Sequence, residues 1–333
     1  MQIFSCPACG GTLYFENTRC ACGQAVTFDP DSQQMITGAA PCANHKTIAC
    51  NWPAEQDGLC RSCAMTRTVP DLATAENTEL WATTEAAKRW MLANLARWGW
   101  FTRADPGPRP TFEMLSEQTR QGEAQVVMGH AEGLITINVT EASEATRAER
   151  RETLGELYRT MLGHMRHEMA HFLHKRLMQE GAFAAAFRQS FGDERADYAA
   201  ALEQHYANPR PADDSHITSY ATSHPHEDWA ETTAHLLHLT DLLDSVAATG
   251  LALPEGPPAG YDAYAESDAD HLLTLAIHIS LALNHVNRAM DLPDVYPFIL
   301  APGVREKLGF VHHWLRRGDP ARTDDQTPAG AAS

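Results

Sequence analysis

Apolar residues recur at helical spacing through most of the chain that follows Pro70. Between residues 80 and 98 they fall close to one helical face, which predicts a helix whose tryptophan-rich face is buried in a core. The proline-free segment 143–178 predicts one long helix, or two helices joined near Gly155 or Gly163. The same periodicity predicts further helices over residues 182–190, 194–206, 227–246, 267–290 and 302–317.

Strand patterns are few and lie in the first half of the chain. Residues 125–139 alternate and are rich in β-branched side chains, with residues 134–138 as the clearest strand. Residues 105–110 contain three prolines and a glycine, which predicts a loop. A short apolar segment at residues 13–15 predicts another strand. Together these patterns predict an α+β protein with a small β-rich N-terminal part and a mostly helical remainder that includes a small sheet.

Composition narrows the classes of protein that remain. With 333 residues the chain is long enough for about two domains, and a hydrophobic fraction of 44% excludes disorder as the main state. The 43 acidic residues outnumber the 26 basic ones, and the net charge of -17 disfavours binding to nucleic acid or anionic lipid. No apolar run approaches the roughly 18–20 residues that cross a bilayer, and the N-terminus lacks a signal-peptide pattern. We therefore expect a soluble cytoplasmic protein with no membrane contact.

All eight cysteines lie within the first 63 residues, so the thiols belong to an N-terminal module. Groups of four thiolates suit tetrahedral zinc. Four disulfides are the alternative, and a cytoplasmic location argues against them. We therefore predict two structural zinc sites, one held by Cys6, Cys9, Cys20 and Cys22 and the other by Cys42, Cys50, Cys60 and Cys63.

The spacing of the first cysteine group is irregular. Cys20 and Cys22 are separated by one residue, whereas a zinc knuckle normally uses two. This spacing predicts either a strained site or a different fourth ligand.

The clustering of the cysteines also marks a domain boundary. We predict a zinc-binding module over residues 1–70, a second domain over residues 71–320 and a disordered tail over residues 321–333.

The chemistry of the second domain centres on one histidine-rich helical segment. His167 and His171 lie one helical turn apart, so both imidazoles project from one face and can bind a single metal ion. Glu168 lies beside them, within reach of a metal-bound water. This is the His-Glu-x-x-His pattern of zinc hydrolases. We interpret His164 and His174, on the same face, as flanking groups that are exposed or that contact a ligand side chain.

A catalytic zinc ion needs a third protein ligand and an open position for water. The best candidate lies downstream in residues 219–231. If a helix begins after Pro225, Glu227 and Glu231 lie one turn apart. The first can then bind the metal, and the second can hold the other nitrogen of a ligating histidine. His224 and Glu231 remain rival third ligands, and acidic residues in the first turn of a helix also occur without any metal.

Several segments together resemble the bacterial family of zinc-binding metallopeptidases with an N-terminal zinc ribbon. They are the Cys-Pro-x-Cys-Gly turn at the N-terminus and residues 133–138, 158–168, 191–195, 224–231 and 291–298. The resemblance implies a zincin-type fold after the zinc ribbon, with His167 and His171 as zinc ligands and Glu168 as the catalytic base. Similarity to the gluzincins favours Glu227 as third ligand and Glu231 as its supporting acid. The short spacing in the first cysteine group departs from the family pattern.

The resulting hypothesis is a zinc-dependent peptidase with a peptide or protein substrate. Zinc would activate a water molecule, and Glu168 would take its proton during attack on a peptide carbonyl. Tyr220 or His224 would donate a hydrogen bond to the developing oxyanion. The strand that ends near Asn138 would form the edge of the cleft, where an extended peptide can pair. We expect about three zinc ions per chain, one catalytic and two structural.

Two other functions compete with this hypothesis. A non-catalytic zinc-ribbon adaptor, with a structural or degenerate metal site, predicts a closed four-ligand centre and a protein partner that binds the ribbon. A nucleic-acid reader needs a local basic patch, for which Arg61, Arg67, Lys88 and Arg89 are the candidates. The acidic net charge makes nucleic acid an unlikely partner.

Overall fold

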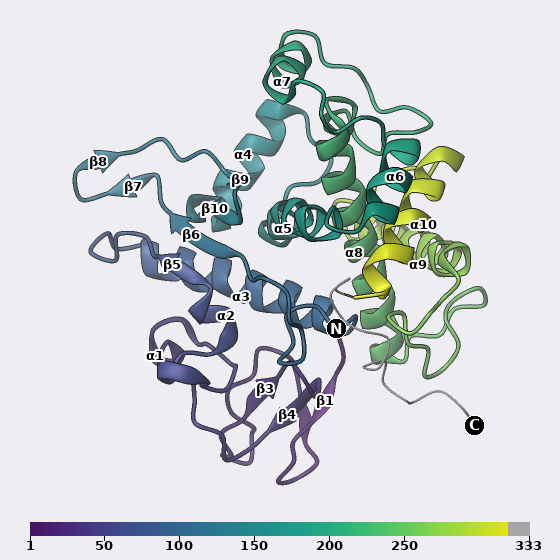
Figure 1. The fold of residues 1–333 in the computed structure, drawn as a ribbon. Coiled ribbons are helices and arrows are strands. Elements are labelled where there is room, and N and C mark those ends of the chain that lie inside the picture. Colours follow the sequence, from purple (N-terminus) through teal and green to yellow (C-terminus); the bar gives the residue numbers. More distant parts are fainter. Residues whose placement is uncertain (319–333) are drawn as a thin grey trace.

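The computed structural model describes residues 1–318, and the tail predicted at 321–333 lies outside them. The described chain is of the α+β class, as predicted, and all its strands precede residue 140 (Figure 1). The strands are β1 (Phe4–Ser5), β2 (Thr12–Leu13), β3 (Thr27–Asp29), β4 (Gln34–Ile36), β5 (Thr66–Thr68), β6 (Thr111–Leu115), β7 (Gln118–Thr119), β8 (Gly122–Glu123), β9 (Gly129–Ala131) and β10 (Leu134–Asn138). The helices are α1 (His45–Ile48), α2 (Arg61–Ala64), α3 (Asn77–Ala96), α4 (Glu144–Leu154), α5 (Met161–Leu177), α6 (Gly181–Ser190), α7 (Tyr198–Ala207), α8 (Pro225–Thr249), α9 (Ala269–Ala289) and α10 (Pro302–Arg316), with 3₁₀ turns η1 (Gln56–Gly58), η2 (Val139–Ala142) and η3 (Tyr220–Thr222).

The largest sheet has four strands in the order β5-β6-β10-β9. β5, β6 and β10 run parallel, and β9 pairs antiparallel to β10. Glu132 and Gly133 join β9 to β10 with φ values of 49° and 89°, and two residues at positive φ form the turn that matches the twist of a hairpin. The strand that ends near Asn138, predicted to form the edge of the cleft where a peptide can pair, is an inner strand of the sheet, because this hairpin places β9 outside it.

The segment 143–178 forms two helices, which is the second of the predicted alternatives. Gly155 ends α4 at a φ of 65°, a conformation that glycine adopts without strain. The Thr160 side chain accepts a hydrogen bond from the Gly163 N–H at 2.9 Å and caps α5. The other predicted helices are present as α6 to α10, although α7 begins at Tyr198, later than predicted. No helix within residues 1–318 has the length and apolarity that a bilayer crossing requires.

Helices α5 and α8 pack against each other near the centre of the molecule (Figure 1). The indole N–H of Trp229 on α8 donates to the Ala170 carbonyl of α5 at 2.8 Å, and Trp229 is fully buried. An aromatic cluster surrounds this contact and is formed by Phe183, Phe187, Phe191, Phe310 and Trp314. This packing fixes the relative position of the two helices that carry the predicted metal ligands.

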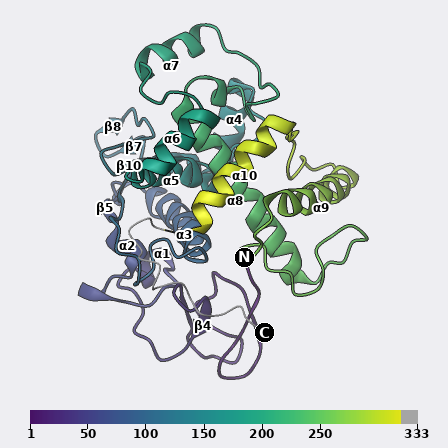
Figure 2. The same cartoon turned by 45° about the vertical axis from the view of Figure 1, so that its right-hand side comes forward.

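The N-terminal part of the chain lies against α3 (Figures 1 and 2). Phe28 is fully buried and contacts Phe15 at a ring-centroid distance of 4.8 Å, and Phe15 contacts Trp90 of α3 at 5.2 Å. β5 precedes the predicted boundary at residue 70, yet it pairs with β6. The cysteine-rich part and the helical part therefore share both a core and a sheet.

The basic patch considered for nucleic-acid binding is not formed. Arg61 and Arg89 are 3% exposed and Lys88 is 0% exposed. Each bonds to a polar partner inside the fold. Arg67 is exposed but does not make a patch by itself. Spacing along the chain could not distinguish these buried cations from exposed ones, because a long basic side chain on an amphipathic helix can point either way.

The buried ion pair between Lys88 and Glu85 gives a testable consequence for stability. Lys88 Nζ lies 2.9 Å from Glu85 Oε1 and neither side chain is exposed. The variant Glu85→Ala leaves a buried cation without its counter-charge. We expect the free energy of unfolding to fall by about 3–5 kcal/mol, measured by urea unfolding followed through tryptophan fluorescence.

A double variant separates loss of the pair from loss of packing. Replacing both partners by apolar residues of similar size, as Glu85→Leu with Lys88→Met, removes the unpaired charge and should recover most of the lost stability. A double variant as unstable as Glu85→Ala would show that packing, not charge, explains the single-variant loss.

Candidate metal centre and active site

Helices α5 and α8 bring three predicted ligands together. His167 Nε2 lies 3.2 Å from His171 Nε2 and 3.0 Å from Glu227 Oε2, and His171 Nε2 lies 3.5 Å from the same oxygen. Ligand atoms placed about 2.1 Å from a tetrahedral ion are about 3.4 Å apart. Two imidazoles and one carboxylate at these distances therefore fit a zinc ion that keeps one position open.

Glu231 lies on the far side of the His167 ring. Its Oε1 is 2.8 Å from His167 Nδ1, and its Oε2 accepts a hydrogen bond from the Thr218 hydroxyl at 2.8 Å. A carboxylate in this position keeps the proton on Nδ1 and leaves the Nε2 lone pair for a metal ion. Burial lowers the pKa of His167, but its hydrogen bonds to Glu227 and Glu231 outweigh burial and hold that pKa well above its ordinary value. This geometry favours Glu231 as the acid that supports the His167 ring, and not as the third metal ligand.

Tyr198, the first residue of α7, bonds to the remaining oxygen of Glu227. Its hydroxyl donates to Glu227 Oε1 at 2.6 Å, while Oε2 faces the two histidines. Burial raises the pKa of the Tyr198 hydroxyl, and so does the nearby charge of Glu227. This residue was not among those predicted from the sequence. No local pattern marks it, because only the fold brings α7 to the start of α8.

Glu168 projects from α5 beside the histidine pair and is 8% exposed. Its Oε2 has no hydrogen-bond partner within the described residues. Burial raises the pKa of the Glu168 carboxyl above its ordinary value. A buried carboxyl of this kind, next to an activated water, can accept a proton and return it.

His224 does not fit either of its predicted roles. It caps α8, with Nδ1 accepting from the His226 N–H at 3.1 Å and Nε2 donating to the Ala196 carbonyl at 3.2 Å. Both ring nitrogens are therefore occupied, and neither can bind the metal or donate to an oxyanion. The Tyr220 ring lies 6.0 Å from the His167 ring, so its role as an oxyanion donor stays a prediction.

The outer histidines of the α5 face are not exposed. His174 is 6% exposed, and its ring lies 4.6 Å from the ring of Phe187. His164 is partly buried, with Nε2 3.5 Å from Glu141 Oε2. Of the two alternatives predicted for these flanking residues, exposure is therefore wrong, and they have one packing role and one polar contact.

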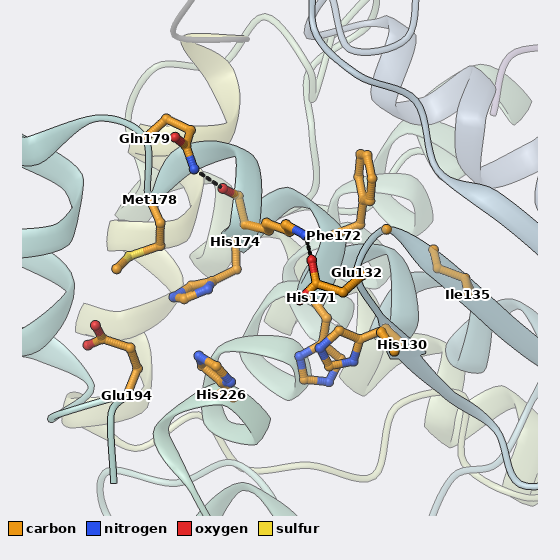
Figure 3. A pocket seen from close by; sticks show the side chains of 13 residues that line it. His130, Glu132, Ile135, His171, Phe172, His174, Met178, Gln179, Glu194 and His226 are labelled. Carbon is orange, nitrogen blue, oxygen red and sulfur yellow. Dashed lines mark hydrogen bonds and ion pairs between the residues drawn. The ribbon is translucent and has the colours of Figure 1, made fainter.

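A pocket of about 450 Å³ opens beside His171 between the β9–β10 hairpin and α5 (Figure 3). His130, from β9, lines it and stacks on His171 with ring centroids 3.9 Å apart and planes 13° apart. His130 was not predicted from the sequence either. The Glu-Gly pair at the turn is a hairpin signal, but nothing in the sequence shows that the preceding strand reaches the histidine pair.

Both groups of four cysteines come together, with the four sulfur atoms of each group within 4.8 Å of one another. The cysteines are free thiols, and the closest sulfur pairs are 3.5 to 4.0 Å apart, well beyond the roughly 2.05 Å of a disulfide. Cys22 Sγ reaches to 4.0 Å from Cys6 Sγ despite the short spacing. In the second group the Cys60 N–H donates to Cys42 Sγ at 3.3 Å. Both groups therefore fit structural zinc without a different fourth ligand.

Comparisons with known proteins address both parts of the chain. A family model described as "Putative zinc-binding metallo-peptidase" matches residues 77–314, and one described as "zinc-ribbon domain" matches residues 3–41. Uncharacterized proteins of Mycobacterium tuberculosis and Mycobacterium bovis are 37% identical to this chain over 327 residues, which covers 94% of this chain and 94% of each relative. No solved structure gives a significant match. The second cysteine group lies between the two matched ranges.

Proposed function

This chain belongs to the zinc-binding metallo-peptidase family and carries an N-terminal zinc-ribbon domain, and on this premise we propose that it is a zinc-dependent peptidase of the gluzincin type. The observation that carries the proposal is the convergence of two imidazoles from α5 and one carboxylate from α8, with a further carboxyl beside them. In the proposal His167, His171 and Glu227 hold one catalytic zinc ion. The two cysteine groups hold two structural zinc ions.

The protein residues have distinct parts in the proposed reaction. Zinc bound at this centre would polarise a water molecule and lower its pKa. Glu168 takes a proton from the attacking water and then delivers it to the leaving amine nitrogen as the C–N bond breaks. Glu231 keeps the His167 ring in the required tautomer, and Tyr198 holds the Glu227 carboxylate in its orientation.

The substrate in this proposal is a peptide in extended conformation. β9 is the edge strand of the sheet and lies beside the histidine pair, so a peptide can add to it by backbone hydrogen bonds. The hydroxyl of Tyr220, whose ring lies 6.0 Å from the His167 ring, supplies the hydrogen bond to the developing oxyanion. Free thiols in two zinc-binding groups suit a reducing compartment, which supports an intracellular site of action.

Metal analysis of a ligand variant tests the proposal. We expect the purified protein to contain about three zinc ions per chain and the variant His167→Ala to contain about two. The zinc ion lost should be the one needed for hydrolysis of a peptide library, because the cysteine groups are unchanged. Inductively coupled plasma mass spectrometry and a fluorogenic peptide assay give the two readings.

His164→Ala is the matched control, because His164 lies on the same helix but outside the donor set. It should keep all three zinc ions. The adaptor alternative predicts a closed centre. A wild-type protein with three zinc ions that neither cleaves the library nor binds a peptide hydroxamate, which needs an open zinc position, would support the adaptor and exclude the peptidase.

A further inference from the structure

His130 is held in a defined orientation at the edge of the centre. It lies in the middle of β9, opposite Ile135 of β10, so the hairpin fixes its backbone. Its ring stacks almost parallel on the ring of His171, at 3.9 Å and 13°, which fixes the ring plane (Figure 3). Because both its backbone and its ring plane are fixed, the His130 side chain is suited to positioning a neighbouring group.

The neighbouring group is the Glu168 carboxylate. Its Oε2 is buried and lacks a hydrogen-bond partner within residues 1–318, which is unfavourable for a buried carboxylate oxygen. His130 Nδ1 lies 3.8 Å from this oxygen. That distance is longer than a hydrogen bond, as catalytic contacts often are before substrate binds and shortens them.

The ring nitrogen of His130 also lies within 4.8 Å of ligand atoms of Glu168 and His171. These three residues could in principle hold a metal ion. His171, however, has Nε2 directed at His167 and Glu227, which form the more compact donor set. An ion at His130 would therefore keep only two protein ligands, so the hydrogen-bonding role is the better supported one.

We propose that His130 is a positioning residue whose Nδ1–H donates a hydrogen bond to Glu168 Oε2 and orients the general base toward the attacking water. This inference rests on the proposed peptidase function. In it, the imidazole satisfies one carboxylate oxygen and leaves the other free to accept the proton. His130 itself neither binds the zinc ion nor exchanges a proton with the substrate.

Two substitutions separate the hydrogen bond from the ring stacking. His130→Phe keeps an aromatic ring over His171 but has no N–H donor, whereas His130→Asn loses the ring and keeps an amide N–H near the Nδ1 position. Loss of a group that orients an active-site residue typically costs 10- to 100-fold in activity, so we expect kcat of His130→Phe to fall by about that factor. KM should change less than about twofold and zinc content should stay at about three ions, whereas His130→Asn should recover much of the lost kcat.

A second measurement does not depend on activity. Selective ¹⁵N labelling of histidine in the zinc-loaded protein reports which ring nitrogen carries the proton, and the His130 signals are those absent from His130→Phe. We expect the Nδ1–H tautomer. An Nε2–H tautomer, full kcat in His130→Phe, or loss of a zinc ion from that variant would each overturn the proposal. An inactive wild type with the Nδ1–H tautomer would instead refute the peptidase function alone.

Discussion

Replacing Glu168 by glutamine should lower kcat for peptide hydrolysis by about 10²- to 10⁴-fold, which is about 3–5 kcal/mol of transition-state stabilisation. Glutamine has nearly the same shape but cannot accept a proton at neutral pH. The carboxyl is buried, so bulk water has little access to replace it as a base. KM should change little, because the side chain acts on the reacting water and does not anchor the peptide. Steady-state kinetics on a cleaved library peptide give both constants.

Zinc content is the internal control for this variant. Glu168 lies outside the donor set of His167, His171 and Glu227, so Glu168→Gln should keep all three zinc ions. Glu152→Gln, at an exposed position on α4, removes the same charge outside the donor set and should keep wild-type kcat. Loss of one zinc ion from Glu168→Gln would make this residue a ligand, and unchanged kcat would remove its role as base.

The variant Cys60→Ser should lose the second structural zinc ion and most of the order of the cysteine-rich part. Cys60 is fully buried at the start of α2, which packs on α3. Binding of a structural zinc ion contributes roughly 10–16 kcal/mol in small zinc modules, which is as large as the whole stability of a typical domain. Because this site adjoins α3, we expect its loss to lower the unfolding temperature of the whole protein. Zinc analysis and differential scanning calorimetry measure the two effects.

Cys9→Ser provides the comparison from the first cysteine group. Cys9 is exposed and lies in the turn between β1 and β2, so its zinc ion should be lost with a smaller effect on the rest of the fold. Equal shifts in unfolding temperature for the two variants would contradict the view that the second site supports α3. A full set of three zinc ions in Cys60→Ser would show that the buried cysteines are not the ligands.

The spacing of residues along the chain predicted much of the candidate site. His167 and His171 share a helical face by periodicity alone, and Glu227 and Glu231 share another for the same reason. A helix N-cap and a proline at its first turn set the start of α8, so the phase of its acidic residues could be predicted. The cysteine groups were likewise predictable, because thiol spacing reports the turns that bring ligands together.

Contacts between distant segments could not be predicted in this way. Tyr198 reaches Glu227 because a loop returns α7 to the start of α8, and no periodicity records that return. His130 reaches the centre only because β9 is the outer strand of a hairpin that sequence analysis merged into one strand. His224 has the right residue type and place in the chain, but its ring nitrogens bond to the local backbone.

The sequence by itself determined which side chains share a helical face and which thiols share a turn, because these relations follow from the fixed geometry of a few residues along the backbone. The tertiary structure decided which faces meet and which oxygen or nitrogen each side chain presents. It also decided that Lys88 points into the core and that β9 borders the histidine pair. Such choices depend on the packing of segments far apart in the chain, where burial and hydrogen bonding favour one arrangement over others that the same local pattern allows.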